Sequence, residues 1–214
     1  MKNVKQYIGE ALRIKSGANI SAKIHKYFPK TKQQLQQIIL ERMQEEGANV
    51  DLNDIDTSAI TDMSYLFDSS ISKLFEYFNG KITLWDVSNV TNMQYMFSFC
   101  KKFNGNLSGW NLKNVEDAKF MFKLCESFEG KGLEKWNVSN IEVTRGMFFN
   151  CKKFNTNISK WKLSKCADAS FMFDGCTTFN QDLSSWDLSH LYDYEDMFYC
   201  CPINLHEEKQ PKFK

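Results

Sequence analysis

Residues 103–125 read FNGNLSGWNLKNVEDAKFMFKLC, and variants of this string recur along most of the chain. The five tryptophans mark these variants at intervals of 25, 26, 25 and 25 residues: Trp85, Trp110, Trp136, Trp161 and Trp186. Each Trp is followed by a Phe after twelve residues and by a Cys after fifteen. An earlier, degenerate copy has Ile55 in the Trp place, which gives about six repeats. A period of this length indicates a stack of structural repeats.

The spacing of apolar residues changes halfway through each repeat. Trp110 and Leu112 are two residues apart, the spacing that places both side chains on one face of a strand. The apolar residues at 93, 96, 97 and 100 follow the i, i+3, i+4, i+7 pattern of one helix face. The sequence therefore predicts an α/β solenoid of about six coils. Each coil is expected to hold one short parallel strand, with its Trp facing inward, and one short helix.

The string from Leu107 to Val115 resembles the L-x-x-L-x-L-x-x-N core of leucine-rich repeats. The full unit, F-N-x-x-L-S-x-W-x-V-S-N-V-x-x-M-x-x-M-F-x-x-C, is similar to the BspA-like bacterial surface-protein repeats over residues 51–201. This resemblance implies a leucine-rich-repeat-like stack of coils, and binding of proteins or cell surfaces. The chain departs from ordinary leucine-rich repeats because an apolar residue, such as Val90, replaces the ladder Asn. We expect the adjacent Asn89, Asn114 and Asn140 to bond backbone amides at that corner instead.

The pattern divides the chain into three parts: a helical head and cap over 1–50, the repeats over 51–201 and a tail over 202–214. Within the head, residues 2–14 have a small apolar face at helical spacing. A second helix is predicted from Thr31, a suitable N-cap, to Gly47, a natural stop. Its apolar stripe consists of Leu35, Ile38, Ile39 and Met43. Its place just before the first repeat is that of a cap over the end of the apolar core.

Composition excludes several classes of function. The formal net charge of +1 argues against bulk nucleic-acid binding. Of the seven cysteines, five hold one repeated core position, which favours reduced, buried thiols. No C-x-x-C pair is present and the three histidines are scattered, so we expect no metal and no cofactor. A column repeats one residue type, whereas catalysis needs unlike residues in one pocket, so we expect no enzyme. The best polar group for catalysis is His190 beside Asp187 and Tyr192, with Cys200 nearby in the chain.

The strand residues beside the inward-facing ones form two polar columns. The first consists of Asp86, Asn111, Asn137, Lys162 and Asp187. The second consists of Ser88, Lys113, Ser139, Ser164 and Ser189. We expect this face to bind a protein partner, as a non-enzymatic scaffold would. The alternative interpretation is that short polar residues simply suit an exposed strand.

Two other functions are compatible with the sequence. The opening residues Met-Lys-x-x-Lys-Gln-Tyr-Ile-x-Glu-Ala resemble the leader of proteins that are packaged inside the capsids of some large tailed phages. This resemblance implies a phage-encoded, virion-packaged or host-interaction protein. A cell-surface adhesin is the other alternative. The first residues lack the apolar segment of a signal peptide, and no stretch is apolar enough to span a membrane, so we expect a cytoplasmic protein.

Overall fold

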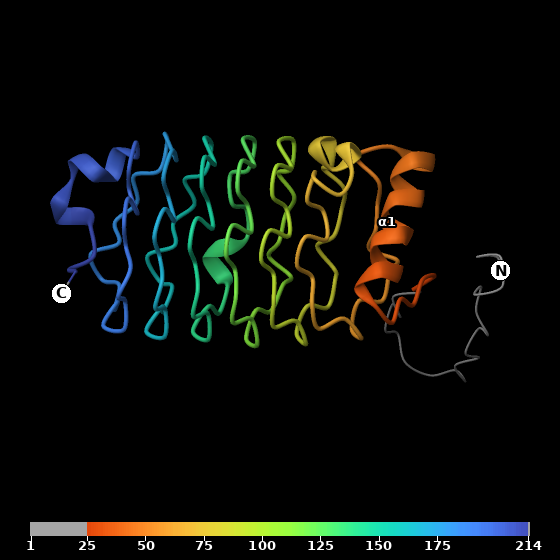
Figure 1. The fold of residues 1–214 in the computed structure, drawn as a ribbon, viewed down its shortest axis with the longest axis horizontal. Helices are drawn as coiled ribbons and strands as arrows, with labels where there is room; N and C mark the ends of the chain where they lie inside the picture. The colour runs from red at the N-terminus through yellow and green to blue at the C-terminus, as the bar shows by residue number, and fades with distance from the viewer. Residues whose placement is uncertain (1–24, 214) are drawn as a thin grey trace, which may run out of the picture.

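The computed structural model describes residues 25–213. The repeats lie side by side along its longest axis, between α1 at one end and the C-terminal residues at the other (Figure 1). Its helices are α1 (Lys32–Glu46) and four short 3-10 helices: η2 (Lys73–Tyr77), η3 (Leu133–Lys135), η4 (Pro202–Leu205) and η5 (Glu207–Lys209). The helix expected over residues 2–14, and with it the leader resemblance, lies outside the described residues.

The predicted α/β solenoid, with one strand and one helix in each coil, is wrong. Within residues 25–213 the backbone forms no strand and no sheet, and α1 is the only α-helix. Isolated parallel bridges join neighbouring repeats instead. The longest series of bridges runs through Asp62, Asn92, Asp117, Val143, Asp168 and Asp193.

The segment around each Trp is built from turns because its apolar residues bracket four-residue bends. The Trp85 amide donates to the Ile82 carbonyl oxygen over 3.1 Å, and the Val90 amide donates to the Val87 carbonyl oxygen over 3.0 Å. Each bond joins residues three apart, which is the hydrogen bond of a β-turn. Both ends of such a turn direct a side chain inward, so the pattern that we interpreted as a strand is two successive bends.

The segment that we interpreted as a helix is also a pair of turns. Met96 donates its amide to Met93 over 3.1 Å, and Cys100 donates its amide to Phe97 over 2.9 Å. The third residue of the second turn, Phe99, has a left-handed φ of 62°, which ends any α-helix. Positions i, i+3, i+4 and i+7 therefore face inward here because they begin and end two consecutive turns.

The other amides of this segment bond to the next repeat. The amides at positions 93, 95, 97 and 99 donate to the carbonyl oxygens at positions 117, 119, 121 and 123, over 2.7–2.9 Å. The amides at 96, 98 and 100 are used inside the turns. Alternate amides thus serve the turn and the neighbouring repeat, so the buried backbone is paired without a continuous strand.

Aromatic rings from successive repeats stack in columns through the core. The rings of Phe97 and Phe122 lie 5.5 Å apart with 3° between their planes, and those of Phe122 and Phe148 lie 5.6 Å apart with 1°. Trp110 and Trp136 continue the same arrangement at 6.3 Å and 2°. Offset stacking of this kind contributes about 0.5–1.5 kcal/mol per pair beyond the burial of area.

The predicted inward orientation of the tryptophans is confirmed. Trp136 is only 5% exposed, and its indole Nε1 donates to the Leu107 carbonyl oxygen of the preceding repeat over 3.1 Å. The buried Cys151 thiol donates in the same direction, to the Phe122 carbonyl oxygen over 2.9 Å. The equivalent Trp and Cys side chains of the other Trp-containing repeats also donate to carbonyl oxygens of an earlier repeat, except Cys201, which donates to the Phe179 carbonyl oxygen of its own repeat.

Helix α1 covers the N-terminal end of the stack, where the sequence predicted a cap. Thr31 accepts a hydrogen bond from the Gln34 amide over 3.2 Å, and Gly47 ends the helix with a φ of 86°. Arg42 ties the helix to the first repeat through Asp54, at 3.0 Å, and also pairs with Glu46. Burial alone would lower the pKa of Arg42, but hydrogen bonds to these two carboxylates outweigh it and raise the pKa.

Replacing Trp136 by Ala is expected to lower the free energy of unfolding by about 3–5 kcal/mol, because it leaves a large cavity inside the stack. Replacing it by Phe is expected to cost about 1–3 kcal/mol, since the Leu107 carbonyl oxygen then loses its donor. Chemical denaturation of both variants gives these values. Tyr192→Ala, at a side chain that is 76% exposed, is the control. Equal stabilities of the wild type and Trp136→Ala would contradict the core assignment.

The thiols give a second test. Burial raises the pKa of Cys100, Cys125, Cys151 and Cys176 well above the ordinary value, and that of Cys201 to about 12. Near neutral pH, one thiol, the exposed Cys200, should react quickly with a thiol reagent, and all seven should react in denaturant. Because these thiols resist ionisation in the folded protein, their contribution to the free energy of unfolding is fully present below about pH 8.5. This contribution is lost as the pH rises further. Rapid labelling of several thiols in the folded protein would argue against a closed core.

Candidate functional site

The predicted polar columns lie on the surface, but their first column shapes the backbone. Its Asp and Asn side chains accept a hydrogen bond from the amide two residues later. Asp86 accepts from the Ser88 amide over 2.9 Å, and Asn137 accepts from the Ser139 amide over 3.2 Å. Asn111 and Asp187 do the same. This is the Asx turn, which gives these short side chains a local structural role. Lys162 is exposed and has no such bond.

A groove lies beside these columns. Its volume is about 490 Å³, within the range of ligand-binding clefts. It is lined by Ser58, Ala59, Thr61, Asn89, Thr91, Asn114, Glu116, Asn140, Glu142 and Lys165. These residues come four or six positions after the Trp or its equivalent in five successive repeats, apart from Ser58, which comes three after Ile55. The groove therefore crosses the repeats along the stack.

Asparagines join the repeats along this groove. Asn114 Nδ2 donates to the Ser88 carbonyl oxygen over 2.7 Å, and Asn140 Nδ2 donates to that of Lys113 over 2.6 Å. Asn89 makes the equivalent bond to Ser58 over 2.9 Å. The expectation that these side chains would bond backbone amides is wrong, because they donate to carbonyl oxygens. The second polar column takes part through its backbone, because its carbonyl oxygens accept these bonds. Ser58, the equivalent residue of the first repeat, lines the groove.

Charged groups lie at the middle of the groove and toward its C-terminal end. Glu116 and Glu142 are exposed, and within residues 25–213 no cationic side chain lies within ion-pair distance of either carboxylate. Lys165 Nζ donates to Asn140 Oδ1 over 2.8 Å. Backbone bonds fix the spacing of these groups, since the Glu142 amide donates to the Glu116 carbonyl oxygen over 2.8 Å. The groove thus presents two free acceptors beside one cation on a fixed backbone.

A ladder of asparagines that accept hydrogen bonds from backbone amides lies outside the groove. The sequence did not predict it. Asn79 Oδ1 accepts from the Asn104 amide over 2.9 Å, and Asn155 Oδ1 accepts from the Asn180 amide over 3.1 Å. These asparagines follow the Phe of the recurring F-N pair, outside the segment that contains the Trp. The recurrence of F-N in the repeat was the signal for this ladder.

His190 and Cys200, the best polar group found in the sequence, are both exposed. His190 Nδ1 lies 3.3 Å from the neighbouring Ser189 Oγ. In the described part of the chain, no group of three or more His, Cys, Asp or Glu side chains is arranged to hold a metal ion. No helix there is long and apolar enough to cross a membrane.

The profile of the family described as "Mycoplasma protein of unknown function, DUF285" matches residues 33–132 and 125–207. The chain belongs to this family. Its two matches cover α1, the repeats and η4, so the family profile describes the whole stack. No curated protein matches the chain, and no solved structure does.

Removal of the Asn140 side chain tests the ladder along the groove. Asn140→Ala is expected to lower the free energy of unfolding by about 1 kcal/mol, because the Lys113 carbonyl oxygen and Lys165 both lose a partner. Lys162→Ala, in a predicted site column, should change it by less than about 0.5 kcal/mol. Denaturant titration of both variants measures the difference. A loss of equal size in the two would show that the ladder bond adds nothing.

Proposed function

We propose that the chain is a non-enzymatic, protein-binding repeat scaffold, and that its partner binds along the groove and the polar columns beside it. The observation that carries this proposal is that equivalent polar positions of five successive repeats line one groove. A surface of this kind offers many similar contacts along a line. It suits an extended protein segment better than a compact small molecule.

The geometry of the repeats supports an extended segment as partner. Segments that are hydrogen-bonded in parallel, as neighbouring repeats are at their bridges, lie about 4.8 Å apart, and an extended chain advances about 3.3 Å per residue. Three residues of an extended segment therefore span about the same length as two repeats. Every third residue of a segment that runs along the groove would meet an equivalent position on every second repeat. Glu116 and Glu142 would accept hydrogen bonds from its amide or cationic side chains, and Lys165 would face an acceptor.

The rigidity of the groove also supports binding. Its side chains are attached to a backbone that is bonded on both sides, and the asparagines are held by the preceding repeat. Fixed groups lose little conformational freedom when a partner binds, so less of the interaction energy is spent on ordering them. The likeness of the repeat unit to BspA-like surface-protein repeats is consistent with a binding role.

Charge reversal in the groove tests the proposal. The double variant Glu116→Lys, Glu142→Lys should capture at least about tenfold less partner from the native host cell than the wild type does, because like charges across an interface oppose binding. Quantitative mass spectrometry of the captured proteins measures the loss. The matched control is Glu45→Lys, Glu129→Lys, at two exposed positions outside the groove. If both double variants capture the same proteins in equal amounts, the groove is not the binding site.

A further inference from the structure

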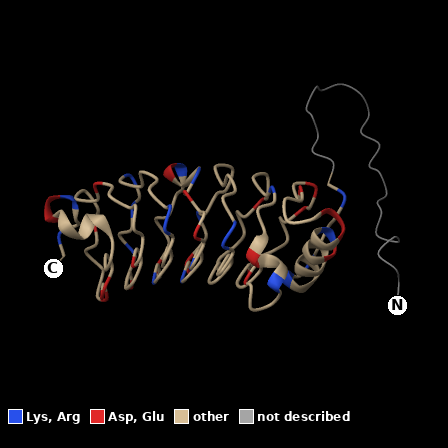
Figure 2. Ribbon diagram, turned by 90° about the horizontal axis from the view of Figure 1, so that it is seen from above, with Lys and Arg blue, Asp and Glu red and all other residues tan. Residues whose placement is uncertain are grey.

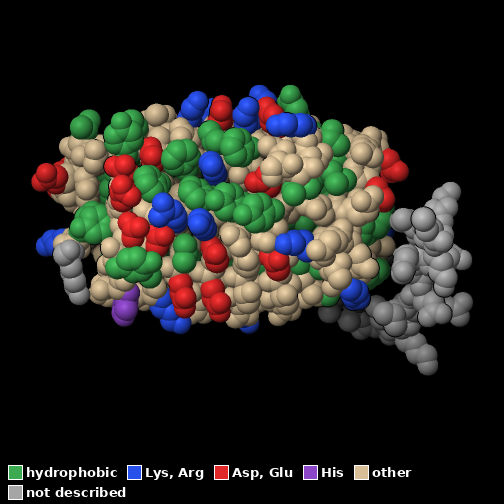
Figure 3. Space-filling view, viewed as in Figure 1, with side chains coloured by type: hydrophobic (Ala, Val, Ile, Leu, Met, Phe, Trp, Pro, Cys, Tyr) green, Lys and Arg blue, Asp and Glu red, His purple; other side chains and the backbone are tan. Residues whose placement is uncertain are grey.

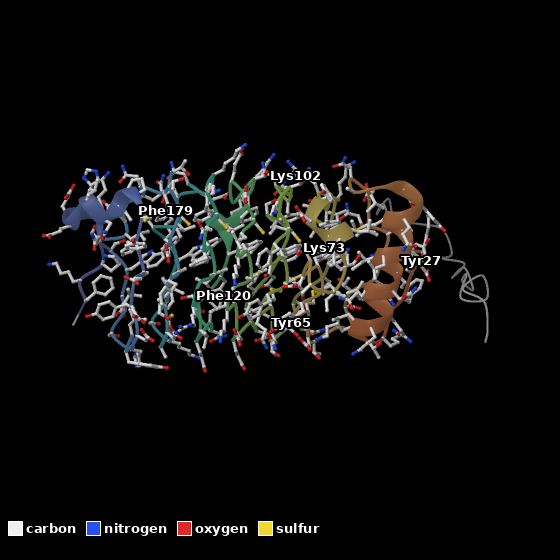
Figure 4. The ribbon with its side chains drawn as sticks, turned by 45° about the horizontal axis from the view of Figure 1, so that its top comes forward. Tyr27, Tyr65, Lys73, Lys102, Phe120 and Phe179 are labelled. Atoms are coloured by element: carbon white, nitrogen blue, oxygen red, sulfur yellow. The ribbon has the colours of Figure 1, made fainter. Side chains whose placement is uncertain are left out.

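A stripe of aromatic side chains runs along another side of the stack. Its residues stand ten positions after the Trp or its equivalent: Tyr65, Tyr95, Phe120 and Phe171, with Gly146 in the fourth repeat and Asp196 in the sixth. We call the four aromatic residues, together with the adjoining Phe99 and Phe149, the aromatic stripe. In Figure 4, Tyr65 and Phe120 lie on the same side of the stack, away from Lys73 and Lys102.

The backbone does not favour aromatic residues at these positions. Tyr65, Tyr95, Phe120 and Phe171 have left-handed φ values between 52° and 57°. A bulky residue in this conformation is an outlier and is strained. Gly146 has a φ of 55° at the same position without that cost. Glycine would therefore satisfy the turn in every repeat.

Stacking of neighbouring rings offsets part of this strain. The rings of Tyr65 and Tyr95 lie 4.8 Å apart, and those of Tyr95 and Phe120 lie 5.1 Å apart. Stacked pairs of this kind stabilise the folded chain. Strained backbone is often found at ligand-binding sites.

The run of stacked rings within the stripe is interrupted at the fourth repeat for a steric reason. A Cβ atom on Gly146 would lie 2.0 Å from Cε1 of Phe120, so the Phe120 ring occupies the space over that glycine. The ring meets the edge of Phe149 instead, with the two centroids 6.4 Å apart and 79° between the planes. An aromatic surface of three repeats is thus held in one arrangement next to Phe149.

Two lysines, Lys119 and Lys123, lie over the rings of the stripe. Lys123 Nζ is 5.3 Å from the centroid of Phe99, 5.2 Å from that of Phe120 and 5.9 Å from that of Phe149. Lys119 Nζ is 5.9 Å from the Phe120 centroid. Within residues 25–213, no carboxylate lies within ion-pair distance of either ammonium group. The ring faces orient these cations, and their charge is not neutralised by the chain.

The same side of the stack becomes acidic toward the C-terminus. Arg145 lies 3.6 Å from carboxylate oxygens of both Asp168 and Asp193, so its charge is used within the chain. Burial, and then the nearby Asp196, raise the pKa of Asp174. Figure 3 shows hydrophobic, Lys and Arg side chains across the middle of its face, and Asp and Glu side chains gathered toward the C-terminal side. Charges of both signs are spread along the stack as a whole, so this polarity is local (Figure 2).

We propose that the aromatic stripe binds an acidic peptide segment of a partner protein, in which a carboxylate side chain adjoins an apolar one. The carboxylate would accept charge-assisted hydrogen bonds from Lys119 and Lys123, and the apolar side chain would pack against Tyr65 and the half-buried rings beside it. The acidic C-terminal side of the stack would repel any further carboxylates of the bound segment, which fixes the direction of the segment. This surface is separate from the groove.

Selection from a random peptide library tests the proposal. The immobilised full-length protein is the target, and the variant Lys119→Gln, Lys123→Gln serves for counter-selection. Selected peptides should be enriched in Asp or Glu next to an aromatic or aliphatic residue. Synthetic copies should bind the variant at least about tenfold more weakly than the wild type, because each lost partner of a charged hydrogen bond is costly. Their affinity should also fall as salt is added.

The matched control is Lys102→Gln, an exposed lysine on a different side of the stack, which should leave the affinity unchanged. Melting temperatures of all variants show that the fold is intact. Selected peptides without acidic enrichment would overturn the proposal, and so would equal binding to the wild type and the double lysine variant. If the wild type dimerises and the double lysine variant does not, the occupant of the stripe is a second copy of the chain, and the proposal of a peptide is wrong. The groove variant Glu116→Lys, Glu142→Lys should bind these peptides normally, which separates the two surfaces.

Discussion

The rest of the structure depends on how the backbone amides are shared between turns and neighbouring repeats. A repeat of bends leaves many amides and carbonyl oxygens buried, and each of them needs a partner. Alternate amides close the turns, and the others reach the next repeat. Side chains complete the pairing: the Trp indoles, Cys thiols and Asn amides bond carbonyl oxygens that remain. Among the described residues, no buried side-chain nitrogen or oxygen is left without a partner.

The sequence revealed the repeats, the inward position of Trp136 and its counterparts, and the helix between Thr31 and Gly47. Each of these follows from a pattern that has one physical meaning. Apolar residues three and four apart have two meanings, because a helix and a pair of successive turns both bring them to one side. A residue with a left-handed φ distinguishes the pair of turns from the helix. At Phe99 and Leu124 this residue is not glycine, so the sequence gives no sign of it. The predicted strand and helix were therefore the wrong choice between two local structures with the same period.

The candidate site shows a similar limit. The predicted columns were chosen because they flank Trp110 and Leu112 on a supposed strand. Since that segment is bent, its Asn111 side chain bonds the backbone of its own turn, and the groove forms from Asn114 and Glu116 instead. The aromatic stripe could not be deduced from residue type, because Phe120 follows the same alternation of apolar residues as the core. Its exposure depends on the direction of a turn that only the folded backbone defines.

The side-chain ladders have a consequence for the order in which the protein forms. Trp136 Nε1, Cys151 Sγ and Asn140 Nδ2 all donate to carbonyl oxygens of residues that were synthesised earlier. Each repeat that leaves the ribosome therefore finds its acceptors already in place on the repeat before it. The newest repeat in turn offers unpaired amides to the one that follows. The stack can grow in the direction of translation, beginning from the α1 end, with each completed layer acting as the template for the next.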